Sequence, residues 1–241
     1  MYNIHMSEII LTKEYIESLG YEVEVVDYRI FLIKNFTKPE EIEEIINQAE
    51  NATQEEWEHH YLEGAINLAK VKFGRTDIDN LVAEGLYELT HNWNDKNLKI
   101  ANWDLATTLN KRAQEVFDFR DDLHFNGCGT IQRQYEGVPL KDHVDNHTDP
   151  SLEYAAVFYL NDNYTDGEVY FVKQDIQLRP DPGDLLVFPT SEDWRHGVNA
   201  PGPGPHRYII PGFISRKGFW DKHQKNNYNV DKTLDDTKYV P

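Results

Sequence analysis

The arrangement of short apolar runs constrains the fold of this chain most strongly. From about residue 123 to about residue 215, runs of β-branched and aromatic residues alternate with Gly, Pro, Asn and Asp. Strands are indicated by CGTIQRQY, LEYAAVFYL, EVYFV, DLLVFP and RYIIPGFI. Short strands at this spacing, with turn residues between them, are typical of an antiparallel sandwich or barrel.

The first half of the chain has a different pattern. The stretch EVEVVDYRIFLIK, residues 22–34, predicts one or two strands. One helix is predicted after Thr37 as its N-cap, and a second from Thr53, where Glu56 completes a capping box. Further helices are predicted over about 77–91 and about 106–119. We therefore expect an α+β protein with one structural domain: a strand and helical support layer over 1–122, a β core over 123–216 and a polar tail over 217–241.

The composition limits the classes of partner. The 42 acidic and 24 basic residues give a formal charge of -18, and such a surface repels nucleic acid and anionic membranes. Cys128 is the only cysteine, which excludes a disulfide framework and a cysteine-rich zinc site. The stretch MYNIHMSEIILTKEY has no basic region followed by an apolar core. We therefore expect no signal peptide and a cytoplasmic protein.

Two overlapping His-x-Asp patterns stand in KDHVDNHTD, residues 141–149: His143 with Asp145, and His147 with Asp149. Side chains two residues apart on an extended chain point to the same side, so either pair can supply two adjacent metal ligands. A His-x-Asp pair in an acidic protein is more often solvated surface. From the spacing alone, both assignments stay open.

A third ligand is available in His196, which follows the strand DLLVFP and precedes the strand RYIIPGFI. Two histidines and one carboxylate on a β scaffold form the facial triad of non-haem Fe(II) oxygenases, which leaves coordination positions open. A structural zinc site would instead be closed by four ligands, often including sulfur.

These motifs occur together in a familiar order. QRQYEGVPLKDHVDN is followed by VFYLND, DGEVYF, PGDLLVFP, HGV and RYIIPGF. This series, over about 131–214, resembles the iron(II)- and 2-oxoglutarate-dependent dioxygenases, in particular the prolyl 4-hydroxylase-like branch. The resemblance implies a double-stranded β-helix, or jelly-roll, supported by N-terminal helices. It also assigns iron to His143, Asp145 and His196, because His143 has the family's spacing to the Tyr-Leu-Asn motif and His147 misses it by four.

The resemblance further implies residues that bind the cosubstrate, 2-oxoglutarate. Arg207, at the start of the last strand, matches the basic residue that pairs with the distal carboxylate. Tyr159 matches a tyrosine that contacts the same carboxylate, and Tyr135 matches another tyrosine that hydrogen-bonds 2-oxoglutarate. Each of the three also has an ordinary structural reading, as a surface ion pair or as core aromatics.

The activity implied by the resemblance is hydroxylation of an unactivated C–H bond with Fe(II), 2-oxoglutarate and O2, and with ascorbate as a candidate reductant. Succinate and carbon dioxide are released. The implied substrate is a prolyl residue in a peptide or protein. A small-molecule or free amino acid hydroxylase and a catalytically silent jelly-roll binding protein are the alternatives. A nucleic-acid demethylase is disfavoured by the charge and by Arg216, which lies too far beyond Arg207. We expect neither a nucleic-acid nor a membrane partner.

Overall fold

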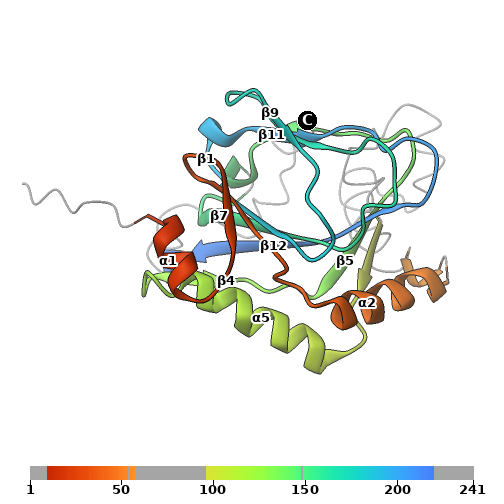
Figure 1. The fold of residues 1–241 in the computed structure, drawn as a ribbon, viewed down its shortest axis with the longest axis horizontal. Helices are drawn as coiled ribbons and strands as arrows, with labels where there is room; N and C mark the ends of the chain where they lie inside the picture. Colours follow the sequence, from red (N-terminus) through yellow and green to blue (C-terminus); the bar gives the residue numbers. More distant parts are fainter. Residues whose placement is uncertain (1–9, 54, 58–95, 148, 220–241) are drawn as a thin grey trace, which may run out of the picture.

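The computed structural model describes residues 10–53, 55–57, 96–147 and 149–219 (Figure 1). Within them, two antiparallel sheets face each other, and helices cover the outer side of the larger sheet. This is the α+β jelly-roll arrangement expected from the sequence.

The larger sheet has eight strands in the order β1-β2-β10-β7-β12-β5-β3, with β4 also paired to β12. The strands in chain order are β1 (Val23–Asp27), β2 (Ile30–Ile33), β3 (Lys96–Lys99), β4 (Leu123–Phe125), β5 (Thr130–Gln134), β7 (Leu152–Tyr159), β10 (Leu185–Pro189) and β12 (Arg207–Arg216). The long strand β12 runs between β7 and β5, so residues far apart in the sequence meet across it. The N-terminal strands β1 and β2 extend the same sheet through β10.

The smaller sheet has four strands in the order β6-β11-β8-β9. They are β6 (Leu140–His143), β11 (His196–Val198), β8 (Val169–Phe171) and β9 (Ile176–Leu178). Two 3-10 turns flank them, η2 (Asp145–His147) after β6 and η3 (Glu192–Trp194) before β11. This sheet therefore carries both predicted histidine ligands, His143 on β6 and His196 on β11.

The helices are α1 (Lys13–Ser18), α2 (Pro39–Asn51) and α5 (Trp103–Phe117). Figure 1 shows α5 and α2 along the side of the larger sheet that faces away from the smaller sheet. The apolar sides of these helices share one core cluster with Phe31, Phe158 and Ile210 of the larger sheet. A second cluster, which includes Leu186, Phe171 and Val198, fills the space between the two sheets. Burial of these two layers fixes which face of each strand points toward the interior.

The strands that the sequence revealed are mostly apolar runs that the structure buries. All five strands predicted in the second half are present, and residues 22–34, where one or two strands were predicted, form two. The short strands β3, β4, β6, β9 and β11 were not predicted. β3 (KNLK) and β6 (LKDH) lack an alternating apolar pattern, so their pairing depends on neighbouring strands.

The predicted helices need two corrections. The N-cap of α2 is Lys38, whose backbone N–H donates to Glu41 Oε2 at 2.8 Å, and Thr37 is instead buried with its N–H bonded to Gly183 O. α5 begins at Trp103, ahead of the predicted 106, because Asn102 Oδ1 caps it by accepting from Leu105 N. The capping box of Thr53 and Glu56 is confirmed. The helix predicted over 77–91 lies outside the described residues.

Among the helices that the structure describes, none combines the length and the apolar character that a membrane crossing requires.

Candidate active site

Three predicted ligands meet at the edge where β6 pairs with β11. His143 is the last residue of β6, and His196 is the first residue of β11. The two strands are antiparallel, and His143 and His196 are directly opposed in their register. Asp145 begins the 3-10 turn η2, which brings the chain back after β6. The sheet pairing, and not the local sequence, therefore joins the distant histidine to the His-x-Asp motif.

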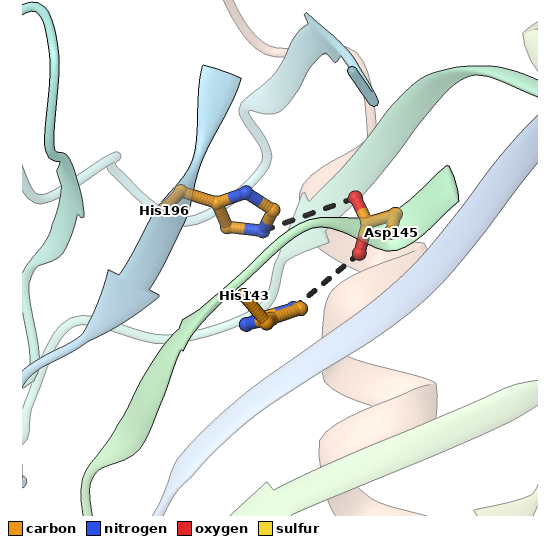
Figure 2. A group of neighbouring side chains, drawn as sticks. All are labelled: His143, Asp145 and His196. Atoms are coloured by element: carbon orange, nitrogen blue, oxygen red, sulfur yellow. Dashed lines mark ion pairs between the residues drawn. The ribbon is translucent and has the colours of Figure 1, made fainter. Parts of the chain in front are cut away.

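The three side chains converge closely (Figure 2). One ligand atom from each, a histidine nitrogen or a carboxylate oxygen, lies within 4.8 Å of the others. The Nε2 atom of His143 is 3.3 Å from Asp145 Oδ1, and that of His196 is 3.9 Å from Asp145 Oδ2. Each imidazole thus faces a different oxygen of the Asp145 carboxylate. Three ligands arranged in this way can bind a single metal ion and leave its other side open.

Backbone carbonyls orient both imidazoles. The Nδ1 atom of His143 lies 2.9 Å from Lys141 O, and that of His196 lies 3.1 Å from Trp194 O. A carbonyl oxygen only accepts hydrogen bonds, so each contact places the ring hydrogen on Nδ1. The lone pair is then on Nε2, which faces Asp145. Such outer contacts fix the tautomer and ring orientation of metal-binding histidines.

Aromatic packing behind His196 keeps this ligand buried. Its side chain is 7% exposed, with the rings of Phe188 and Phe171 at centroid distances of 4.5 and 5.7 Å. Burial lowers the pKa of His196 to about 4, a shift that Asp145 partly opposes. Neutral imidazole is the form that binds metal ions, so His196 is already in the competent form at neutral pH.

His143 has a different electrostatic environment. Burial alone would lower the pKa of His143, but in the protonated ring Nε2 donates a hydrogen bond to Asp145, and this bond and the negative charge of Asp145 outweigh burial. The pKa of His143 is therefore raised. The same carboxylate that favours imidazolium also favours a cation bound between the two groups.

The second His-x-Asp copy lies apart from this cluster. The His147 side chain is 60% exposed, and its Nε2 atom is 3.3 Å from Glu192 Oε2. Asp149 closes a local turn, because its Oδ1 atom accepts from the backbone N–H and the hydroxyl of Ser151 at 2.9 and 2.7 Å. In the part of the chain that the structure describes, the triad with His143 is the group with metal-ligand geometry.

Arg207 and Tyr159, both predicted to bind 2-oxoglutarate, lie side by side in the interior. Arg207 is 3% exposed and begins β12, while Tyr159 ends the neighbouring β7 and is 1% exposed. Arg207 Nη2 donates to the Tyr159 hydroxyl at 3.1 Å. Burial raises the pKa of Tyr159, so its hydroxyl keeps its proton and can donate to an anion.

Gln134 was missed by the sequence reasoning. It ends β5 directly opposite Arg207, and its Oε1 atom accepts from Arg207 Nη1 at 3.3 Å. Gln134 Nε2 in turn donates to Val138 O at 2.8 Å. An amide in a strand gives no sequence signal of this kind, since the contact depends on pairing between β5 and β12.

Tyr135, the third predicted 2-oxoglutarate residue, follows Gln134 and lies in other surroundings. Arg133 donates a hydrogen bond to its hydroxyl, and its ring is edge-on to His206 at a centroid distance of 4.9 Å. Arg133 itself stacks on Trp57 at 4.1 Å from the ring centroid. These contacts do not test the assigned role, and it stays a prediction.

Comparison with known families agrees with this geometry. The model of the 2OG-Fe(II) oxygenase superfamily matches residues 130–215. This match supports the resemblance of the segment to the 2OG-Fe(II) oxygenase superfamily. The matched segment runs from β5 to the end of β12 and includes all three residues of the triad. No curated protein matched the chain.

Solved structures share the fold of this protein. A prolyl hydroxylase from Trichoplax adhaerens, in complex with a peptide fragment of the hypoxia inducible factor oxygen degradation domain, aligns with a TM-score of 0.55 and 15% identity. The alignment covers 89% of this chain and 91% of that one. The viral collagen prolyl hydroxylase from Paramecium Bursaria Chlorella virus-1, in a truncated form, gives 0.52 and 14% identity over 78% and 90%.

The donor set fits the cofactors of the superfamily, Fe(II) and 2-oxoglutarate. Two imidazoles and one carboxylate are the facial ligands of non-haem Fe(II), and they leave positions for a chelating oxo acid. The hydrogen bonds of Arg207 described above go to a neutral amide and a neutral hydroxyl. A carboxylate beside this buried guanidinium would form a charge-assisted pair.

Proposed function

We propose that this protein is a 2-oxoglutarate-dependent oxygenase that hydroxylates a prolyl residue of a peptide or protein, with His143, Asp145 and His196 as the iron ligands. The observation that carries the iron site is the convergence of the three ligand atoms within 4.8 Å on the β6–β11 edge. When bound, iron would activate O2 with 2-oxoglutarate as the co-reductant, so that one oxygen atom would enter the C–H bond and the other would enter succinate, with loss of carbon dioxide.

The residues of the chain supply orientation and a dry environment. The carbonyls of Lys141 and Trp194 hold the two imidazoles in place. Phe171 and Phe188 pack against His196 and exclude water from that side. A reactive centre that is shielded in this way is protected from side reactions with solvent.

Arg207 and Tyr159 bind the distal carboxylate of 2-oxoglutarate in this proposal. The guanidinium offers a planar fork that matches a carboxylate, and the Tyr159 hydroxyl adds a second donor. Gln134 holds the guanidinium from the neighbouring strand. Tyr135 remains a predicted contact of 2-oxoglutarate, and ascorbate a candidate reductant.

The prolyl substrate is supported by the likeness to hydroxylases of the same fold, one of them in complex with a peptide. We expect purified protein with Fe(II), 2-oxoglutarate and O2 to release succinate in the presence of a proline-containing peptide. The peptide should gain the mass of one oxygen atom, and a matched peptide with alanine in place of proline should not. Succinate release with free amino acids alone would contradict the peptide substrate and leave the oxygenase site intact.

A further inference from the structure

Tyr164 is a buried tyrosine in the connection between β7 and β8. Its side chain is 2% exposed, and its hydroxyl has no hydrogen-bond partner among the described residues. Leaving a buried hydroxyl without a hydrogen bond destabilises a protein. Most buried polar groups have a partner, so this hydroxyl calls for an explanation such as a ligand that the protein binds.

The position of Tyr164 brings it to the end of the sandwich that holds Arg207. Gly167, at φ +74°, lies beside both: a Cβ atom there would be 3.2 Å from Tyr164 Cε2 and 3.5 Å from Arg207 Cδ. The missing side chain lets the aromatic ring and the arginine stem converge on one backbone segment. The nearness of Tyr164 also contributes to the raised pKa of Tyr159, after the larger effect of burial and the opposing charge of Arg207.

The connection around Tyr164 is held on two sides. Arg179 donates to the carbonyl oxygens of Asp162 and Tyr164, and its guanidinium lies 4.4 Å from the centroid of the Tyr164 ring. On the other side, Gly202 N donates to Thr165 O at 2.9 Å. The ring is therefore fixed before any ligand arrives, and preorganised donors bind with a smaller entropy cost.

We infer that the Tyr164 hydroxyl is a further donor to the distal carboxylate of 2-oxoglutarate, beside Arg207 and Tyr159. This inference rests on the proposed function, in which Arg207 anchors the same carboxylate. The connection between β7 and β8 thus contributes to cosubstrate recognition, and Tyr164 favours 2-oxo acids that carry a second carboxylate over those that lack it.

The test compares two 2-oxo acids, 2-oxoglutarate and pyruvate, by isothermal calorimetry on the Mn(II)-loaded protein. Pyruvate has the chelating end and lacks the distal carboxylate. Tyr164→Phe keeps the ring that packs against Arg179 and removes only the hydroxyl. Tyr154→Phe is the matched control, because Tyr154 is also buried on β7 and its hydroxyl bonds to Arg29, away from Arg207.

A hydrogen bond to a charged group contributes roughly 1.5–3 kcal/mol, so Tyr164→Phe should weaken 2-oxoglutarate binding about tenfold or more. Pyruvate binding should stay unchanged, and Tyr154→Phe should bind both acids as the wild type does. If Tyr164→Phe lost affinity equally for the two acids, or bound 2-oxoglutarate as the wild type does, the inference about Tyr164 would be wrong and the proposed function would stand. A wild-type protein that binds neither acid would contradict the proposed function as well.

Discussion

Arg207 and Gln134 are opposed residues of β12 and β5, joined by a side-chain hydrogen bond of 3.3 Å in the interior of the protein. The amide is neutral, so this contact orients the guanidinium without adding a negative charge beside it, which suits a site for an anionic cosubstrate. The Tyr159 hydroxyl bonds to the other terminal nitrogen of the same guanidinium. The three side chains come from three neighbouring strands of one sheet.

Replacing the Gln134 amide by a carboxylate tests whether Arg207 binds the distal carboxylate of 2-oxoglutarate. In Gln134→Glu, the new carboxylate would pair with Arg207 and compete with the distal carboxylate of 2-oxoglutarate. We expect the KM for 2-oxoglutarate to rise at least about tenfold, because a charge-assisted pair is roughly twice as strong as a neutral hydrogen bond. Gln134→Met, which removes the bond without adding charge, should have a smaller effect. A KM for Gln134→Glu equal to that of the wild type would argue against Arg207 as the anchor.

Gly197 is expected to control the approach of β11 to β6. A Cβ atom at this position would lie 2.8 Å from the backbone oxygen of Leu140 and would collide with the Tyr170 hydroxyl. Gly197→Ala should therefore shift His196 away from His143 and weaken Fe(II) binding by roughly 10- to 100-fold, as other disturbances of ligand orientation do. Gly129→Ala is the control, since nothing lies within 4 Å of a Cβ there. Titration of both variants with Fe(II) measures the effect. Wild-type affinity in Gly197→Ala would contradict the role of Gly197 in placing His196.

The ion pair between Glu41 and Arg112 predicts a pH-dependent stability. Arg112 donates to both carboxylate oxygens at 2.7 and 2.8 Å and so joins α2 to α5. Burial raises the pKa of Glu41, but these bonds and the N–H of Lys38 outweigh burial, and the net pKa is lowered. Because the pKa of Glu41 is lower in the folded state, the ion pair stabilises the protein at pH values above the unfolded-state pKa of about 4.3. This stabilisation is lost as the pH falls through the lower pKa of the folded state.

Glu41→Gln should therefore reduce the free energy of unfolding at pH 7 by about 1 kcal/mol, after allowance for solvent screening. The difference from the wild type should shrink as the pH falls below about 4. Urea denaturation of both proteins at several pH values measures it. A difference that stayed constant down to acid pH would show that the charge of Glu41 does not contribute.

Much of the site was predictable because its motifs are local. His143 and Asp145 are two residues apart, and His196 lies at a recognisable strand boundary, so the candidate ligands could be found in the sequence, and the resemblance to the family joined them into one cluster. The choice between the two His-x-Asp copies needed the family's spacing, and the structure adds a physical reason. His147 lies on the exposed side of η2 against Glu192, and Asp149 is engaged by Ser151.

Other features depend on pairing between distant segments. Gln134 reaches Arg207 only because β5 and β12 are neighbours, and Tyr164 lies near Arg207 through a turn at Gly167. Neither arrangement leaves a pattern in the local sequence. The strands β3 and β6 were missed for a related reason. Polar residues dominate both, and they become strands by pairing with neighbouring strands.

The most direct test of the account is the visible charge-transfer band of the anaerobic complex with Fe(II) and 2-oxoglutarate. It should be recorded for the wild type, His143→Ala and His147→Ala, two substitutions of the same kind four residues apart. The account predicts a band in the wild type and in His147→Ala, and no band in His143→Ala. A band that persists in His143→Ala and disappears in His147→Ala would contradict the assignment of iron to His143, Asp145 and His196.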